Sequence, residues 1–362
     1  MIMDHKLKLM VVDDSPLFRT WLIHSLSADD RFQVVGYAVN ALDAQEKIPL
    51  LQPDMLTLDI EMPGMSGIDF LKQLLPVHPI PVILVSSLNL RVFDALEAGA
   101  VDFVRKPDEA NGLSKEIFLS MLRSKLLVAA ASHVHLPSVP ASPQVAKKRI
   151  VSPLTAAGNP FLNRPKTSAA ASQETVIAIG ASTGGTEAIL EVVKNFPADT
   201  PGVVITQHMP AGFTAMYAER LNRICKMEVR EAKNGDRIRK GLMLLAPGGL
   251  QMRVVPLGNS YAVSVQEGEK VNGHRPSVDV LFDSVALHVR EHAIGVLLTG
   301  MGADGAAGLL RMRKNGAYTI GQDKNSCVVY GMPMEAHKIG AVCQQCPLNT
   351  IGQTVLARVS FR

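Results

Sequence analysis

A segment without acidic residues divides this chain into two parts. Residues 129–173 contain no Asp or Glu, and six prolines fall there among alanines and serines. The segment shows no sustained helical or strand period, which is typical of an extended linker. Its basic residues are Lys147, Lys148, Arg149, Arg164 and Lys166. We therefore predict an N-terminal domain at 1–128, a basic linker at 129–174 and a C-terminal domain at 175–362.

The linker also explains the net charge of the chain, which is +4. Without its five basic residues, the chain holds 32 basic against 33 acidic side chains. Neither domain therefore has the basic balance that is typical of nucleic-acid binding, and aromatic residues at 5% are few for stacking on bases. We expect the linker to be a tether, with docking of residues 147–149 on an acidic partner as the alternative.

Composition and cysteine content limit the class of protein further. Hydrophobic residues at 47% and charged residues at 19% are typical of globular domains. No apolar run approaches the roughly 18 residues that a spanning helix needs, and the N-terminus lacks the features of a secretory signal. Four cysteines in 362 residues are too few for a disulfide framework. We expect a cytoplasmic protein without membrane insertion, in which Cys343 and Cys346 have a structural or incidental role.

Both domains alternate strand and helix signals. In the first domain we predict strands at 7–12, 32–39, 55–58, 82–85 and 102–105, and a last helix at 113–128. In the second we predict strands at 175–181, 203–206, 228–230, 294–298 and 318–320. The period switches to 2 between Gly241 and Glu267, with turns at Gly248-Gly249 and Gly258-Asn259, which predicts a hairpin insertion. The fold class is α/β, with two doubly wound parallel-sheet domains, one flavodoxin-like and one Rossmann-like with a β-hairpin insertion.

Polar residues follow the predicted strands of the first domain. Asp13-Asp14, Asp59, Ser86 and Lys106 each stand at a strand end, where ligands bind in parallel sheets. Converging carboxylates need a cation, and oxygen ligands beside a phosphoryl group suggest Mg²⁺. Lys106 could then hold phosphoryl oxygens and Ser86 could hydrogen-bond to them. Each feature alone is more often a solvated turn or a strand exit, but their order favours a phosphorylation site.

At these residues the first domain resembles the receiver domains of two-component response regulators. The matching stretches are 12–15, 58–67, 85–87 and 99–107. The resemblance implies that a partner histidine kinase phosphorylates Asp59. It implies that Mg²⁺ is held by Asp14, Asp59 and the carbonyl group of Glu61, with Asp13 acting through water. Ser86 and Phe103 match the switch positions, and the stretch 86–98 is short for this family.

A serine stands in a glycine-bracketed turn at the start of the second domain. The run Gly180-Ala-Ser182-Thr-Gly184 follows a predicted strand and precedes a helix predicted over 186–195. Such a turn exposes the serine above the strand end, and the helix N-terminus favours an oxyanion there. A serine needs a base, and His208 ends the next strand. Asp304 lies in a glycine-rich loop after a third strand, where it could orient the imidazole.

Other interpretations of these residues stay open. The serine motif occurs by chance, a lone histidine is more often structural, and Asp304 could simply form an Asx-turn. A dinucleotide-binding turn is disfavoured because the G-x-G start is missing and His208 stands where a ribose-binding acid would be expected. The run His274-Arg-Pro-Ser-Val-Asp279 could cap the following helix or face the pocket.

The second domain resembles the catalytic domain of the chemotaxis protein-glutamate methylesterases. The motifs that carry this resemblance are at 179–185, 207–210, 274–279, 298–305 and 330–333. It implies that Ser182 is the nucleophile, His208 the general base and Asp304 its orienting partner. It also implies that the Met301 amide helps to stabilise the oxyanion, and we expect the oxyanion to form near Met301 and the turn that begins at Thr183.

From both resemblances we expect a phosphorylation-activated serine esterase of chemotaxis adaptation. It would hydrolyse glutamate γ-methyl esters on the cytoplasmic helices of chemoreceptors, releasing methanol, and deamidate receptor glutamines. Its partners would be a histidine kinase of the chemotaxis type and methylated chemoreceptors, and the esterase reaction itself would need no cofactor. The alternatives are a C-terminal binding module without catalysis and, less favoured, a DNA-binding output domain, for which there is no short helix-turn-helix signal.

Overall fold

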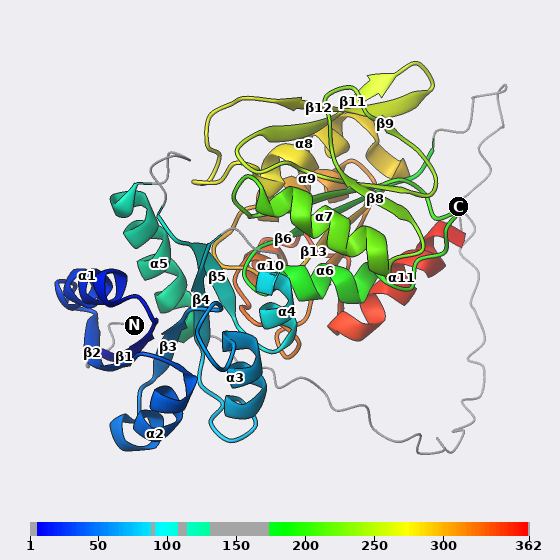
Figure 1. Ribbon diagram of the computed structural model, residues 1–362. Coiled ribbons are helices and arrows are strands. Elements are labelled where there is room, and N and C mark those ends of the chain that lie inside the picture. The colour runs from blue at the N-terminus through cyan, green and yellow to red at the C-terminus, as the bar shows by residue number, and fades with distance from the viewer. Residues whose placement is uncertain (1–5, 88–90, 108–113, 131–173, 361–362) are drawn as a thin grey trace, which may run out of the picture.

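The computed structural model describes residues 6–87, 91–107, 114–130 and 174–360, which form two α/β domains (Figure 1). The predicted linker at 129–174 lies almost wholly outside the described residues, so its boundaries stay a prediction. No helix in the described ranges is long and apolar enough to cross a membrane.

The N-terminal domain is a five-stranded parallel sheet in the order β2-β1-β3-β4-β5. Its strands are β1 (Leu7–Val12), β2 (Phe32–Ala38), β3 (Met55–Leu58), β4 (Val82–Ser86) and β5 (Asp102–Arg105). Its helices are α1 (Pro16–Ser27), α2 (Ala41–Leu51), α3 (Gly67–Leu74), α4 (Arg91–Glu97) and α5 (Lys115–Ala130). Buried residues of α1 and α5 pack on one face, and those of α2, α3 and α4 on the other. The predicted strands are confirmed.

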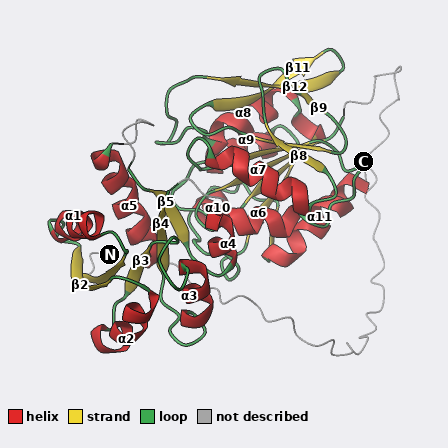
Figure 2. Ribbon diagram, viewed as in Figure 1, coloured by secondary structure: helices red, strands yellow, loops and turns green. Residues whose placement is uncertain are grey.

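The C-terminal domain is built on a seven-stranded parallel sheet in the order β15-β14-β13-β6-β7-β10-β8. Figure 2 shows the helices of this domain packed around its strands. Its strands are β6 (Val176–Ala181), β7 (Val203–Gln207), β8 (Glu228–Glu231), β10 (Leu242–Leu245), β13 (Ala293–Leu297), β14 (Tyr318–Gln322) and β15 (Gln344–Cys346). Helices α6 (Gly185–Val193), α7 (Phe213–Ile224) and α11 (Leu348–Ser360) cover one face. The other face carries α8 (Val278–His288), η2 (Arg290–His292), α9 (Ala306–Lys314) and α10 (Met332–Lys338).

The predicted hairpin insertion is present but begins later than expected. Strands β11 (Gln251–Leu257) and β12 (Ser260–Gln266) pair antiparallel, with β9 (Arg237–Ile238) at their side. Residues 242–245, which we had included in the insertion, instead form β10 between β7 and β8. All four β10 residues are apolar and buried, and such an unbroken apolar run is typical of a parallel strand covered on both faces.

The two domains pack against each other through aromatic side chains. The ring centroids of Phe93 and Tyr217 lie 5.4 Å apart, and those of Phe103 and Phe213 lie 4.5 Å apart. Arg220 on α7 binds both Glu187 of its own domain and Glu97 of the N-terminal domain, at 2.7 and 2.9 Å. These contacts place β5 of the first domain beside the loops that follow β6 and β7 (Figure 1).

Candidate active site

Ser182, His208 and Asp304 follow three adjacent strands of the C-terminal sheet. These strands are β6, β7 and β13, with β6 in the middle. The His208 amide donates to the Ala181 carbonyl at 3.2 Å, and the Ser182 amide donates to the Thr299 carbonyl at 3.0 Å. The structure therefore brings the three predicted residues to one edge of the sheet, as expected for loops at the carboxyl ends of parallel strands.

The Gln207 side chain stabilises the turn that carries Ser182. The side-chain amide of Gln207 donates to the Ser182 carbonyl at 2.8 Å, and the Gly185 amide donates to the same oxygen at 2.7 Å. A Cβ at Gly185 would lie 2.2 Å from Gln207 Oε1, so only glycine fits there. Gly184 has φ +74°, which also favours glycine. From sequence, Gln207 was recognised only as part of the 207–210 motif and was given no role.

His208 and Asp304 form a buried hydrogen bond. His208 Nε2 lies 2.7 Å from Asp304 Oδ2, and the two side chains are 7% and 1% exposed. The second ring nitrogen, His208 Nδ1, is also buried and has no hydrogen-bond partner among the described residues. Because Nε2 is occupied by the carboxylate, Nδ1 is the nitrogen left to accept a proton.

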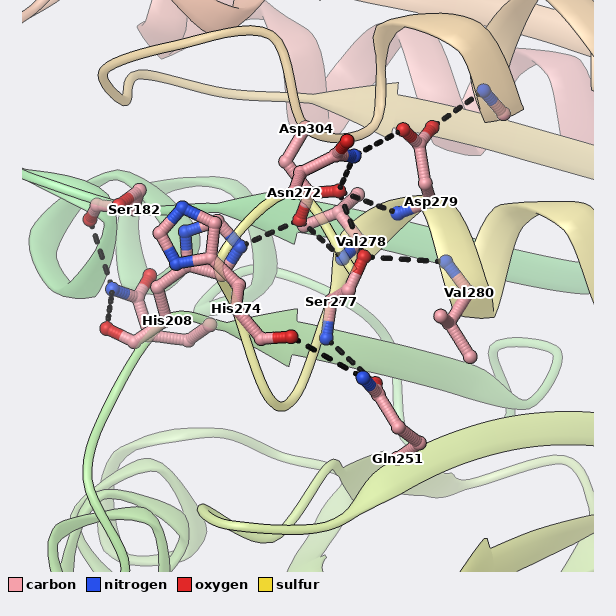
Figure 3. A network of polar contacts seen from close by, with 12 residues as sticks. Ser182, His208, Gln251, Asn272, His274, Ser277, Val278, Asp279, Val280 and Asp304 are labelled. Carbon is pink, nitrogen blue, oxygen red and sulfur yellow. Dashed lines mark hydrogen bonds and ion pairs between the residues drawn. The ribbon is translucent and has the colours of Figure 1, made fainter. Parts of the chain in front are cut away.

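The Asp304 carboxylate is surrounded by hydrogen-bond donors (Figure 3). Besides His208, these donors are the Val278 amide at 2.7 Å, the Asp279 amide at 3.2 Å, the Ser277 hydroxyl at 2.8 Å and the Asn272 side-chain amide at 2.8 Å. Burial alone would raise the pKa of Asp304, but His208, Asn272 and Ser277 outweigh it and hold this pKa well below its usual range. Asp304 is therefore an anion that lies at the N-terminus of α8, where negative charge is stabilised.

His274 covers the ring of His208. The two imidazole centroids lie 3.6 Å apart and the ring planes are 10° from parallel. Burial, together with the charge of His208, lowers the pKa of His274 to about 4. His274 is therefore neutral at pH 7 and shields the His208 ring from water. The 274–279 motif both caps the following helix and faces the site. Ser277, the N-cap of α8, accepts a hydrogen bond from the Val280 amide, and His274 lies against His208.

The predicted oxyanion residues lie on either side of Ser182. Met301 follows β13 in an exposed loop, and a Cβ at the neighbouring Gly300 would lie 2.7 Å from Ser182 Cβ. Thr183 is buried, and its hydroxyl donates to Asp102 Oδ2 of the N-terminal domain at 2.8 Å. Asp102 is also paired with Lys125 at 2.6 Å. A residue of the first domain thus binds directly beside the serine, which the sequence did not reveal.

The N-terminal domain brings its predicted acidic residues together. Carboxylate oxygens of Asp13, Asp14 and Asp59 lie within 4.8 Å of one another. Lys106 Nζ is 2.6 Å from Asp59 and 2.9 Å from Asp13. Burial raises the pKa of Asp59 despite the opposing charge of Lys106. A set of carboxylate oxygens facing a lysine suits a hard divalent cation such as Mg²⁺.

The remaining predicted receiver residues lie around this cluster. The Ser86 hydroxyl is buried and has no hydrogen-bond partner in the described part of the chain, so it is available to a phosphoryl oxygen. The Glu61 amide donates to Asp59 Oδ1 at 3.1 Å. Phe103 is buried against the C-terminal domain. Helix α4 covers Arg91–Glu97, and residues 88–90 lie outside the described ranges, so the shortness of the 86–98 stretch stays a prediction.

The four cysteines are free thiols. Cys343 is exposed and accepts a hydrogen bond from the Thr319 hydroxyl at 3.2 Å, whereas Cys346 is buried. Among the residues that the structure describes, only the Asp13, Asp14 and Asp59 cluster brings three or more metal-binding side chains close enough to share an ion. Cys343 and Cys346 thus show no sign of a metal site.

Comparisons with known proteins identify the families that both domains match. Residues 177–355 match the family model described as CheB methylesterase, and residues 9–118 match the response regulator receiver domain. The chain is 51% identical over 350 residues to protein-glutamate methylesterase/protein-glutamine glutaminase 2 of Syntrophomonas wolfei, covering 97% of each chain. It is 42% identical to the Salmonella typhimurium protein of that name, covering 98% of this chain and 97% of that one. The crystal structure of the Thermotoga maritima CheB methylesterase catalytic domain superposes with TM-score 0.50 and 32% identity over 51% of this chain and 98% of that one.

Proposed function

The chain belongs to the CheB methylesterase family, and on that premise we propose that Ser182 carries out hydrolysis of glutamate γ-methyl esters on chemoreceptors. The protein is a protein-glutamate methylesterase and protein-glutamine glutaminase with a receiver domain that places it under control by phosphorylation. The observation that supports the assignment of residues is the hydrogen bond between His208 and Asp304, at the ends of β7 and β13, on either side of the strand β6 that Ser182 follows.

In the first half of the reaction, Ser182 Oγ attacks the ester carbonyl carbon while His208 takes the hydroxyl proton. The buried Nδ1 atom is the acceptor, because Nε2 carries its hydrogen toward Asp304. Asp304 stays ionised, so it fixes this tautomer and stabilises the imidazolium that forms. The roles of the two ring nitrogens are reversed relative to the common serine-protease arrangement.

The negative charge of the tetrahedral intermediate develops beside the Ser182 turn. The N-terminus of α6, which begins at Gly185, and the Met301 loop flank this position. We assign the Thr183 and Met301 amides as oxyanion donors, since amides in a preorganised turn stabilise such a charge without rearrangement. The imidazolium then returns its proton to the leaving methoxide, and methanol departs.

In the second half, a water molecule gives its proton to His208 and attacks the acyl-enzyme. The Ser182–acyl bond breaks, the serine regains its proton from the imidazolium and glutamate is released. With a glutamine side chain the leaving group is ammonia instead of methanol, and the other steps are the same. These steps use only side chains and amides of the chain, so the proposed esterase reaction requires no cofactor.

Phosphorylation of Asp59 by a histidine kinase of the chemotaxis type is the proposed regulatory input. The oxygens of Asp14 and Asp59 and the Glu61 carbonyl would hold Mg²⁺, with Asp13 reaching it through water. This ion, when bound, would offset the charge of the incoming phosphoryl group. Lys106 and the unpartnered Ser86 hydroxyl would then hold the phosphoryl oxygens of phospho-Asp59.

The contact between the domains supports inhibition by the unphosphorylated receiver. Asp102 of β5 accepts from Thr183, next to the nucleophile, and the adjacent Phe103 packs on Phe213, which begins the helix after the His208 loop. Two consecutive receiver residues thus contact the residue after Ser182 and the first residue of the helix that follows the His208 loop. We propose that phosphorylation shifts the population away from this docked arrangement and opens the serine to chemoreceptor helices, which would place the enzyme in the cytoplasm.

Replacing the nucleophile tests the catalytic assignment. Ser182→Ala should abolish release of labelled methanol from chemoreceptor membranes that carry radiolabelled methyl esters, because no other group in the proposed mechanism can attack. A serine-directed fluorophosphonate should label the wild-type protein at Ser182 and should not label the variant. Thermal unfolding provides the control for folding. Methanol release by a folded Ser182→Ala variant would contradict the proposal and favour a binding module whose activity comes from elsewhere.

A further inference from the structure

A tight turn presents Asn272 to the catalytic carboxylate. Val271 and His274 exchange two backbone hydrogen bonds, at 3.0 and 2.9 Å, around a two-residue loop. Asn272 and Gly273 have φ of +53° and +82°, as in the two-residue hairpin turns that Asn-Gly favours. The turn lies at the molecular surface and directs the Asn272 side chain inward (Figure 3).

The amide nitrogen of Asn272 bridges two carboxylates. It donates to Asp304 Oδ1 at 2.8 Å and to Asp279 Oδ2 at 2.7 Å. A primary amide has two hydrogens, so each carboxylate receives one of them. Asp279 is itself buried and accepts from the Gly308 amide at 2.6 Å. The chain of contacts therefore runs from His208 through Asp304 and Asn272 to Asp279.

We propose that Asn272 is a positioning residue of the esterase, which keeps Asp304 aimed at His208 while separating its charge from that of Asp279. The inference rests on the proposed role of His208 as the base. Asp304 has other donors, but those are fixed to the start of α8. Asn272 alone among them reaches both carboxylates, and an amide is the one small side chain that can donate twice without adding charge.

The charges around this network determine what a change at Asn272 would do. Asp304 faces His208 and Asp279, and His208 is stacked on His274. His274 is also within electrostatic range of Lys125 and Lys270. Asp279 faces Asp283 and, at 3.9 Å, Arg311. Burial, with the charge of Asp304, raises the pKa of Asp279, so an added negative charge at this place is poorly compensated.

Two variants preserve the backbone and change only the side chain. Asn272→Gly removes the amide, and Asn272→Asp replaces a donor by a carboxylate of the same shape. Glycine and aspartate both tolerate a positive φ, and the exposed turn leaves no large cavity. Asn259→Asp is the matched control, because Asn259 stands exposed in the turn between β11 and β12.

The readout is the pH dependence of kcat/KM for labelled methanol release by the full-length protein. We expect Asn272→Gly to lower kcat about ten-fold with little change in KM, the effect of losing one hydrogen bond to a charged group. In Asn272→Asp the extra negative charge favours the imidazolium form of His208. The acidic limb of the profile should then move about one unit to higher pH, and the rate should recover in alkaline buffer.

Asn259→Asp should leave both the rate and the profile as in the wild type. An Asn272→Asp profile with an unmoved acidic limb would overturn the proposal, as would an Asn272→Gly enzyme with wild-type kcat. A purely structural role predicts a loss that is equal at every pH and tracks the fraction of folded protein. Failure of the esterase assignment itself would be recognised separately, since wild-type turnover would then survive Ser182→Ala.

Discussion

The two domains hold their functional carboxylates in opposite ways, although both place them at the carboxyl ends of a parallel sheet. Asp304 is surrounded by protein donors, and its pKa lies well below the usual range. Asp59 lies close to Asp13 and Asp14, and burial raises its pKa despite the opposing charge of Lys106. In the proposed mechanism the first site uses protein groups alone, whereas the second would also take a cation and a phosphoryl group. In the proposed roles, Asp304 as the orienting acid is stabilised by groups of the protein itself, whereas the charge of Asp59 as the phosphoryl acceptor would be offset by a bound cation.

The largest expected effect tests the completeness of the catalytic site. Asp304→Asn puts an amide opposite His208 Nε2, which removes the counter-charge of the imidazolium and disturbs the tautomer. We expect kcat for methanol release to fall by about 10³-fold or more at pH 7. The matched comparison is Asp283→Asn, an acid on the outer side of α8 that is 46% exposed. A loss below ten-fold for Asp304→Asn would mean that the protein donors around it do not serve the base.

The next effect separates the two sites by their need for a cation. Asp59→Asn, or EDTA with the wild-type protein, should abolish the stimulation of methanol release by acetyl phosphate and Mg²⁺. Neither should change the unstimulated rate, because the proposed esterase reaction uses only protein groups and water.

Phe103→Ala should raise the unstimulated rate of methanol release about three- to ten-fold by loosening the contact with Phe213. A drop in the unstimulated rate with EDTA would break the comparison, and an unchanged rate in Phe103→Ala would contradict inhibition by docking.

The smallest effect concerns stability at mild acid pH. The pKa of His274 is about 4 in the folded protein against about 6.5 when unfolded, so the unfolded chain binds a proton first as pH falls. The free energy of unfolding should decrease from pH 7 toward pH 4 and level off below it. The shift sets an upper limit of about 3 kcal/mol, which partial exposure reduces to about 1–2 kcal/mol. His274→Phe keeps a stacked ring without a titrating group and should lose this part of the pH dependence in urea titrations. A slope equal to that of the wild type would show that His274 is not its source.

The sequence was sufficient to predict which polar residues follow most of the strands. The five strands of the first sheet, five of the seven strands of the second, and the positions of residues 182, 208 and 304 after their strands follow from local apolar runs and the polar residues after them, whereas β15 was not predicted. Strand β10 was misassigned because period-2 alternation was extended over an apolar run. Asn272 and the stacking of His274 were missed, since their partners lie 32 and 66 positions away along the chain and depend on side-chain packing. The pairing of Asp102 with Thr183 was missed for the same reason, as it crosses between domains.

The position of Asp102 and Phe103 limits how freely this receiver could be exchanged for another. Receiver domains share a common scaffold, yet here two neighbouring side chains of β5 must fit Thr183 and Phe213 of a particular hydrolase. Under the proposed inhibition by docking, a transplanted receiver with an intact phosphorylation site would still accept a phosphoryl group but would lack the contacts that restrain the enzyme. The interface between the two domains would therefore contribute to the specificity of the signal. Substitutions on one side of this interface would need matching substitutions on the other side to keep the proposed restraint.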